Sequence, residues 1–287
     1  MGIEPAANIA HIAEEAGIPT LTRFFGKETA LSLVAEGTQA DLLIGNNVLA
    51  HVPDLNDFVA GLELLLKPEG VLVMEFPHLM RMIEHNQFDT IYHEHFSYLS
   101  FTTVQRIFEA HGLELIDVEE LPTHGGSLRI FAKHKGQSRH PIEPNVSALL
   151  AEEKRGGLQE LATYKYFDDR MKQTKYALLE FLIKAKKEGH SIVGYGAPAK
   201  GNTLLNYCGI RTDFLDYTVD RSSQKQGCLL PGTRIPVYSP DKLQETKPDY
   251  ILILPWNIQS EIIQQLNYTR QWGAQLLVAI PSPKLVG

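Results

Sequence analysis

Short apolar runs alternate with helical patterns in both halves of the chain, and this alternation restricts the possible fold more than any other feature. In the first half we predict strands at residues 41–44, 71–76, 113–121 and 127–133, and helices at 55–66 and 102–111. We expect residues 67–70 (KPEG) to stop the first of these helices. Such alternation is typical of a mostly parallel sheet covered on both faces, so we predict an α/β fold.

A charged helical stretch separates the two halves, with a break at Gly156-Gly157. After His190 a second α/β pattern begins, with strands expected at 191–195, 214–219, 250–254 and 275–280 and a helix at 199–207. The sequence therefore predicts three parts, which are an α/β domain at 1–135, a helical linker at 136–189 and a second Rossmann-like α/β domain at 190–287.

Composition excludes several classes of function. The formal net charge is −7, which argues against coating nucleic acid or an anionic membrane. No apolar run approaches the ~18 residues of a membrane span, and no signal peptide is visible. Cys208 and Cys228 are the only cysteines, too few for a four-thiolate metal site. We expect a cytoplasmic protein that binds neither nucleic acid nor membrane.

The segment FDTIYHEHFSYLS, residues 88–100, concentrates titratable and hydrogen-bonding side chains. Tyr92, Glu94 and His95 combine phenol, carboxylate and imidazole, which suits proton abstraction next to a carbonyl. His93 and His95 would share one face of a strand and could bind a metal, but no further ligand is evident and we predict no metal site. Histidines packed within a loop remain an alternative for these residues.

Polar residues also follow two predicted strands. Asn46, Asn47 and His51 come after strand 41–44, where ligands lie in open parallel sheets, although Asn is also a common turn residue. Glu4, in the opening segment GIEPA, could accept both hydroxyls of a ribose, or could simply be an exposed carboxylate.

The turn GYGAPAKGN, residues 194–202, lies between a predicted strand and helix. It contains G-x-G-x-x-A, and Asp220 follows about twenty residues later, as in dinucleotide-binding units. The glycines allow close backbone approach to a phosphate, and the helix N-terminus favours anions. Lys200 adds positive charge, so we predict anion or nucleotide binding here.

The turn HGGS, residues 124–127, joins two predicted strands. Its glycines and the small hydroxyl of Ser127 could turn backbone amides toward a ligand. A plain turn is an equal alternative.

Taken together, these segments resemble the deoxysugar C-methyltransferases, which use S-adenosylmethionine (SAM) to methylate carbon 3 of nucleotide-linked 4-keto sugars. The resemblance spans nearly the whole chain in family order. The matching stretches are GIEPAANIAHIAEEAGIPT, NNVLAHVPDL, FDTIYHEHFSYLS, HGGSLRIFA and GYGAPAKGNTLLNYCGI. By this resemblance residues 1–135 are part of a class I, Rossmann-like SAM-binding domain and 190–287 help to hold the sugar nucleotide.

The sequence departs from the family pattern at its start. It lacks the family's zinc-binding domain with four cysteines, the first strand of the methyltransferase sheet and the glycine-rich SAM loop that follows it. We expect this absence to leave neighbouring strands unpaired and one wall of the cofactor site open. A separate N-terminal fragment is therefore one conceivable partner.

The resemblance also assigns roles to residues. It places Tyr92, Glu94 and His95 on the catalytic motif and His51 beside them. A base, His95 in our preferred assignment, removes the proton at carbon 3, and the resulting enolate attacks the sulfonium methyl. Spacing alone leaves open which group is the base. The other residues implied are Glu4, Asn46 and Asn47 for SAM, and Gly196, Ala197, Lys200, Asn202, Asp220, His124 and Ser127 for the sugar nucleotide.

Two other functions remain open at this point. The second α/β unit could capture a nucleotide sugar without turnover, as a binding module. The glycine turn alone also fits an NAD-dependent oxidoreductase.

Overall fold

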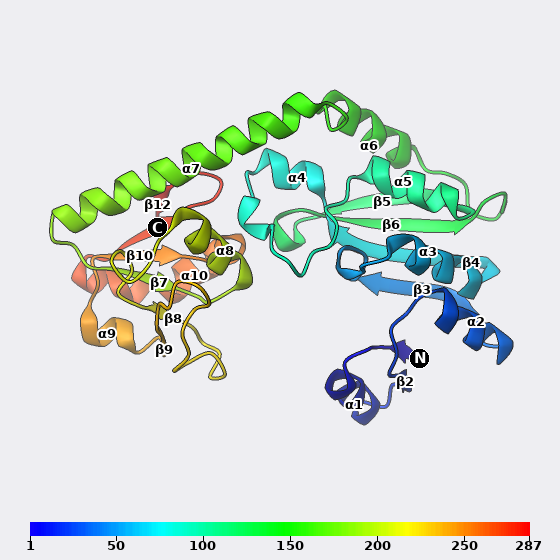
Figure 1. The fold of residues 1–287 in the computed structure, drawn as a ribbon, viewed down its shortest axis with the longest axis horizontal. Coiled ribbons are helices and arrows are strands. Elements are labelled where there is room, and N and C mark those ends of the chain that lie inside the picture. Colours follow the sequence, from blue (N-terminus) through cyan, green and yellow to red (C-terminus); the bar gives the residue numbers. More distant parts are fainter. The chain divides into compact units, whose positions relative to one another are not determined.

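The computed structural model describes all residues from 1 to 287, and the chain divides into two compact units (Figure 1). Unit 1 comprises Met1–Met80 and Glu94–Gln159, and unit 2 comprises Arg81–His93 and Glu160–Gly287. The assignment of Arg81–His93 to unit 2 is a feature that the sequence did not indicate.

Unit 1 contains two separate sheets, one of two parallel strands and one of four strands. Its strands are β1 (Gly2–Ile3), β2 (Thr20–Leu21), β3 (Ala40–Asn46), β4 (Leu66–Pro77), β5 (Leu113–Leu121) and β6 (Ser127–His134). Its helices are α1 (Ala7–Glu15), α2 (Lys27–Ala35), α3 (Leu55–Leu65), α5 (Phe101–Ala110) and α6 (Pro144–Arg155), with 3-10 turns η1 (Leu49–His51) and η3 (Thr123–Gly125). The four-stranded sheet has the order β3-β4-β6-β5.

The sheet of unit 1 is mixed, so our expectation of a mostly parallel sheet is wrong for this unit. β3 and β4 are parallel, whereas β6 runs antiparallel to both β4 and β5. Helix α3 ends at Leu65, as the expected stop at residues 67–70 predicts, but β4 begins at Leu66 directly after it and not at residue 71. An irregularity in the pairing with β3 absorbs these residues before regular pairing resumes at Leu42 and Val71.

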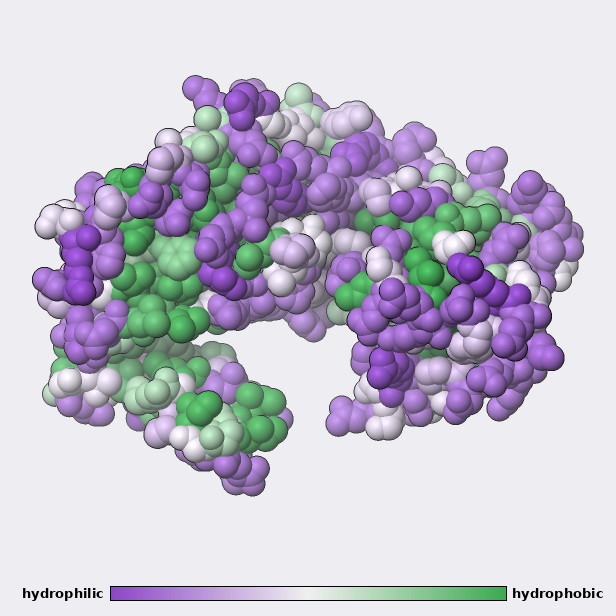
Figure 2. Space-filling model, turned by 180° about the vertical axis from the view of Figure 1, so that it is seen from behind, coloured by the Kyte–Doolittle hydropathy of each residue, from purple (hydrophilic) through white to green (hydrophobic).

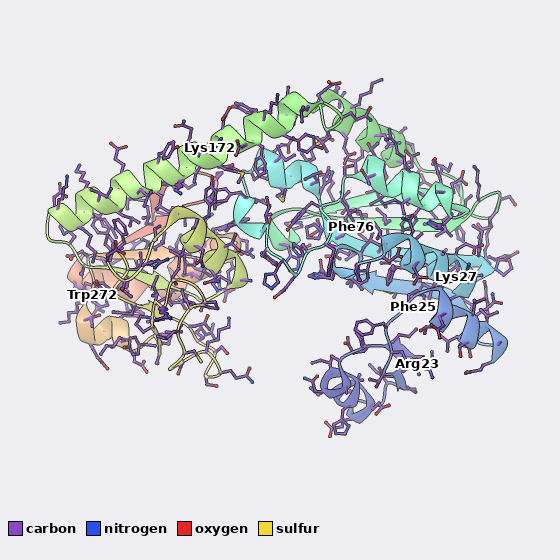
Figure 3. All side chains as sticks on the ribbon, in the orientation of Figure 1. Arg23, Phe25, Lys27, Phe76, Lys172 and Trp272 are labelled. Carbon is purple, nitrogen blue, oxygen red and sulfur yellow. The ribbon has the colours of Figure 1, made fainter.

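The core of unit 1 lies on one face of this sheet. Leu72, Met74 and Phe76 alternate along β4 and are fully buried, as period-two strands require (Figure 3 labels Phe76). They pack in one cluster with side chains of α3 and α5. Asp54 caps α3 and Ser100 caps α5, each accepting a hydrogen bond from a backbone amide of the first turn.

The edge of the sheet at β3 is unpaired and partly apolar. Leu42 is 53% exposed and Ile44 is 66% exposed, and both lie on the face opposite the core cluster. Broad apolar areas are visible on unit 1 in Figure 2. Strand β1 belongs to the other sheet, so no strand of residues 1–287 covers this edge of β3. An open edge of this kind can accept a further strand.

Unit 2 is an α/β unit around a six-stranded, mostly parallel sheet of order β12-β11-β10-β7-β8-β9. Its strands are β7 (Ile192–Tyr195), β8 (Thr218–Val219), β9 (Val237–Tyr238), β10 (Tyr250–Ile253), β11 (Gln275–Val278) and β12 (Lys284–Val286). Its helices are α7 (Leu161–Lys187), α8 (Ala199–Cys208), α9 (Lys242–Thr246) and α10 (Gln259–Gln265), with 3-10 turns η2 (Phe88–Thr90), η4 (Trp256–Ile258) and η5 (Asn267–Trp272). Helix α4 (Leu79–Glu84) spans the boundary between the two units.

The second α/β pattern and the long helices are confirmed. The predicted break at Gly156-Gly157 separates α6 from α7. The expected strand at 214–219 is shorter and begins only at Thr218. None of the helices is both long enough and apolar enough to cross a membrane.

Candidate active site

Two side chains of the predicted site, His51 and His95, meet Tyr98 in unit 1, beyond the carboxyl end of β3. The ring centroids of His51 and His95 are 4.7 Å apart, and those of His95 and Tyr98 are 5.7 Å apart. The loop is fixed locally because the amides of Phe96 and Ser97 both donate to the carbonyl of Ala50 in η1. The predicted association of His51 with His95 is thus present, and Tyr98 joins it.

One hydrogen bond determines the tautomer of His51. Its Nδ1 lies 2.9 Å from the carbonyl oxygen of Glu94. Because a carbonyl oxygen only accepts, Nδ1 carries the proton and Nε2 of the neutral ring keeps its lone pair. The side chain of Glu94 is exposed, and Tyr92 and His95 are half-buried. The cluster therefore combines proton acceptors and donors that solvent or a ligand can reach.

Asn47 and His124 are both held in the left-handed region of backbone conformation, with φ of 54° and 55°. Their side chains contact each other, with Asn47 Nδ2 lying 3.3 Å from His124 Nε2. The Oδ1 atom of Asn47 is buried and has no hydrogen-bond partner. Non-glycine residues in this conformation often mark functional sites, and the unpaired oxygen is an acceptor that a ligand could satisfy.

Ser127 and Glu4, two other predicted site residues, make contacts within their own turns. The hydroxyl of Ser127 donates to the carbonyl of Thr123 and so closes the η3 turn. Glu4 follows β1, and its Oε1 accepts from the amide of Ala6 at the start of α1. Asn46 ends β3 and is exposed.

Sequence reasoning missed Glu75 and Arg129, which support the turn that carries His124. Glu75 is buried at the end of β4, accepts from the hydroxyl of Thr123 at 3.0 Å, and pairs with Arg129 at 3.2 Å. The only signal in the sequence is a carboxylate inside the apolar run VLVMEF.

The glycine turn of unit 2 has the expected strand–turn–helix context between β7 and α8. Gly196 has φ of +89°, and a Cβ there would lie 2.6 Å from Pro255, so only glycine fits. The amide of Ala197 donates to Asp220 Oδ2 at 2.7 Å, and the amide of Ser222 donates to Oδ1 at 2.8 Å. Asp220 therefore stabilises the turn with both carboxylate oxygens.

A cavity of about 210 Å³ lies beside this turn, at the carboxyl ends of β7, β8 and β10. Gly196, Asp220, Arg221 and Lys225 are among the residues that line it. Lys200 and Asn202 do not line this cavity. The predicted residues of this region therefore divide into those that line the cavity and those that lie outside it. Asn202 carries another buried oxygen without a partner, its Oδ1.

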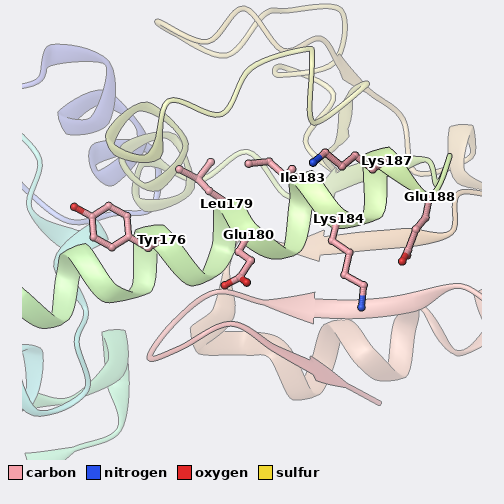
Figure 4. A pocket seen from close by; sticks show the side chains of 7 residues that line it. All are labelled: Tyr176, Leu179, Glu180, Ile183, Lys184, Lys187 and Glu188. Atoms are coloured by element: carbon pink, nitrogen blue, oxygen red, sulfur yellow. The ribbon is translucent and has the colours of Figure 1, made fainter.

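Another hollow runs along α7 but contains none of the predicted site residues (Figure 4). It is lined by Tyr176, Leu179, Glu180, Ile183, Lys184, Lys187 and Glu188. In residues 1–287 no three His, Cys, Asp or Glu side chains are placed to hold a metal ion.

The fold and the sequence together define a SAM-dependent, Rossmann-like methyltransferase. A family model described as a methyltransferase domain matches residues 2–118, and one described as a C-methyltransferase C-terminal domain matches residues 122–281.

The chain belongs to the C-methyltransferase family. It is similar to C-methyltransferase NovU of Streptomyces niveus, with 37% identity over 286 residues that cover 100% of this chain and 68% of NovU. The chain is thus a methyltransferase, and SAM is its methyl donor.

Solved methyltransferases are similar to about half of the chain. Magnesium protoporphyrin IX methyltransferase of Synechocystis PCC 6803, with bound SAM, shares 14% identity, with a TM-score of 0.34 over 47% of this chain and 58% of its own. A SAM-dependent methyltransferase of Thermotoga maritima shares 17% identity, with a TM-score of 0.37 over 47% and 73%. At these scores the likeness carries no argument about function.

Proposed function

We propose that this protein methylates carbon 3 of a nucleotide-linked 4-keto sugar through an enolate. The observation that carries this proposal is the cluster of His51, His95 and Tyr98 within the methyltransferase unit. A hydrogen on the carbon next to a ketone is acidic enough for an imidazole to remove when the enolate is stabilised.

In this mechanism His95 takes the proton from carbon 3, and the electron pair of the broken C–H bond moves toward the ketone oxygen. Tyr92 donates a hydrogen bond to that oxygen, His51 holds the sugar by accepting a hydroxyl hydrogen bond at Nε2, and Glu94 tunes the imidazole of His95. SAM, when bound, would supply an electrophilic methyl group for carbon 3, and its sulfur would leave with the electron pair of the broken S–CH3 bond as S-adenosylhomocysteine. The protein contributes mostly position and charge stabilisation.

Residues of unit 1 fit one wall of a SAM site. We propose that Glu4 binds the ribose hydroxyls of SAM, and that Asn46 and Asn47 contact a second part of the cofactor. The unpaired Oδ1 of Asn47 supports this, because it needs a donor. We further propose that an additional parallel strand, from a preceding segment or a separate N-terminal fragment, pairs with the open edge of β3 and completes the site.

In unit 2 we propose Lys200, Asn202 and the turn at Gly196 and Ala197 for the sugar nucleotide. In unit 1 we propose His124 and Ser127 as residues that recognise sugar hydroxyls. Asp220 is a weaker candidate because its oxygens are engaged by the turn. For the same reason we do not favour an NAD-dependent oxidoreductase. The cytoplasmic location stays a prediction.

Transfer of a ¹³C-labelled methyl group from SAM to TDP-4-keto-6-deoxyglucose tests the proposal. We expect a new methyl signal on carbon 3 of the sugar by NMR, and none with His95→Ala, which should still bind the sugar nucleotide. Sugar binding without transfer by the wild-type protein would instead favour the binding module. Loss of sugar binding in His95→Ala would assign that residue a structural role.

The phosphate role of Lys200 is tested by Lys200→Ala. We expect the dissociation constant for the sugar nucleotide to rise about tenfold, because one charge-assisted contact to phosphate is lost. Calorimetry measures it, with the exposed Lys165→Ala as the matched control. An unchanged dissociation constant would refute this role.

A further inference from the structure

The segment that leads into the Tyr92–His95 motif is anchored along its length by side chains of unit 2. Arg170 on α7 donates to the carbonyls of Ile83 and Glu84 at 3.0 and 2.9 Å. Asn86 donates to the hydroxyl of Thr174 at 2.8 Å and to the carbonyl of Pro281 at 3.0 Å. The start of the motif is therefore positioned by contacts from residues distant in the sequence.

The last of these anchors is a buried carboxylate. Asp89, in η2, is 0% exposed, and its Oδ2 accepts from the indole Nε1 of Trp256 at 2.7 Å. Its Oδ1 is buried without a partner. The ring of the preceding Phe88 packs against Tyr207 of α8, with centroids 5.1 Å apart. Tyr92 follows Asp89 by only three residues, so the position of this carboxylate restricts where the motif begins.

The same tryptophan contacts Lys200. The Nζ atom of Lys200 lies 4.6 Å from the centroid of the Trp256 ring and donates to Asn257 Oδ1 at 2.9 Å. Burial lowers the pKa of Lys200, while the charge of Asp89 opposes this effect. Burial likewise raises the pKa of Asp89 to about 7, against the hydrogen bond of Trp256 and the charge of Lys200. Trp256 therefore contacts both the carboxylate of Asp89 and the ammonium group of Lys200.

We propose that Asp89 is a positioning residue, whose hydrogen bond with Trp256 links the phosphate-binding Lys200 to the start of the catalytic motif. This proposal rests on the proposed function for the roles of Lys200 and Tyr92. When a sugar nucleotide binds at Lys200, the first residues of the motif are then already held in position. This positioning should increase the rate of turnover more than the affinity for the sugar nucleotide.

Fluorescence of Trp256 tests the contact without reference to function. In a Trp272→Phe background, Trp256 is the only tryptophan. We expect its emission to change in one step near neutral pH as Asp89 titrates, and no step when Asp89→Asn is added. The groups facing the carboxyl are Trp256 from η4 and Lys200 from α8. Emission that stays flat with pH, or a step that persists in Asp89→Asn, would overturn the linkage.

Kinetics test the positioning role. With TDP-4-keto-6-deoxyglucose in D2O, we expect Trp256→Phe and Asp89→Ala to lower the rate of deuterium exchange at carbon 3 about tenfold or more, with the dissociation constant changed less than about threefold. Asp89→Asn should largely restore exchange, because its amide oxygen can still accept from the indole. The exposed Asp213→Ala is the control.

Equal losses in exchange and binding, or full exchange in Trp256→Phe, would overturn the proposal. Trp256→Phe keeps an aromatic ring in place and so serves if Asp89→Ala does not fold. Absence of exchange in the wild-type protein would count against the proposed function, whereas the fluorescence step would still report on the contact itself.

Discussion

At the level of single residues, some groups of the candidate site can be recognised in the sequence and others cannot. Tyr92, Glu94 and His95 are adjacent in the chain, so their chemistry is visible as a motif. The contact between Asn47 and His124 joins positions far apart in the sequence, and both residues adopt a conformation that costs about 1–3 kcal/mol each. No local pattern predicts this contact, because it depends on the pairing of β3 and β6 with β4, which brings the end of β3 close to the turn before β6.

Glu153 is a buried residue with a supporting role. Its carboxylate accepts from His78 Nε2 at 2.7 Å, from the amides of Phe101 and Thr102 at 2.6 and 2.8 Å, and from the Thr102 hydroxyl. It therefore satisfies the first amides of α5, where the helix dipole also favours negative charge. Burial alone would raise the pKa of Glu153, but these hydrogen bonds together lower it.

We expect Glu153→Gln to lower the free energy of unfolding by about 2–4 kcal/mol, because the amide has one acceptor oxygen where the carboxylate has two. Urea denaturation at pH 7 measures this change. Exposed Glu109→Gln at the end of α5 should have almost no effect. Equal effects of the two substitutions would contradict the role assigned to Glu153.

The stability difference between the wild-type protein and Glu153→Gln should also depend on pH. Since the folded pKa of Glu153 is lowered, its contribution is complete above the ordinary carboxyl pKa of about 4.3 and is lost as pH falls through the lowered value. The difference in unfolding free energy between wild type and Glu153→Gln should therefore be constant from pH 8 to about 5 and shrink in more acid solution. A difference that grows with acid would contradict this assignment.

At the level of elements, periodicity predicted most helices and strands but not their directions. The runs in β4, β5 and β6 were predicted as strands, yet the antiparallel course of β6 is a property of pairing and leaves no mark on a single strand. The start of β4 at Leu66 was missed because Pro68 and Gly70 normally indicate a turn. Here they lie in an irregular stretch beside β3, where the pairing tolerates both.

The open edge of β3 has a measurable consequence for stability. Ile44→Thr should change the free energy of unfolding by less than about 0.5 kcal/mol, because Ile44 is 66% exposed and Thr keeps the β-branch. Leu72→Ala, on the neighbouring β4, should cost about 2–5 kcal/mol, because Leu72 is fully buried. Urea denaturation of both variants checks this contrast. A large cost for Ile44→Thr would mean that this face of β3 is already covered in solution.

At the level of the whole molecule, the boundary between the two compact units falls inside the proposed catalytic motif. Arg81–His93 belongs to unit 2, and Glu94–Gln159 belongs to unit 1. The sequence suggested two α/β patterns with a helical stretch between them. It did not indicate that Arg81–His93 packs with the later part of the chain, because that packing depends on Arg170, Thr174 and Trp256, all distant in sequence.

The proposed function requires this protein to remove the proton on carbon 3 of a nucleotide-linked 4-keto sugar. The most direct measurement is NMR of TDP-4-keto-6-deoxyglucose in D2O with the protein and without SAM, which isolates proton removal from methyl transfer. We predict that the wild-type protein accelerates deuterium uptake at carbon 3. We expect His95→Ala to bind the sugar nucleotide without accelerating this uptake. Bound sugar nucleotide with no accelerated exchange in the wild-type protein, or equal exchange in His95→Ala, would contradict the proposed proton removal by His95.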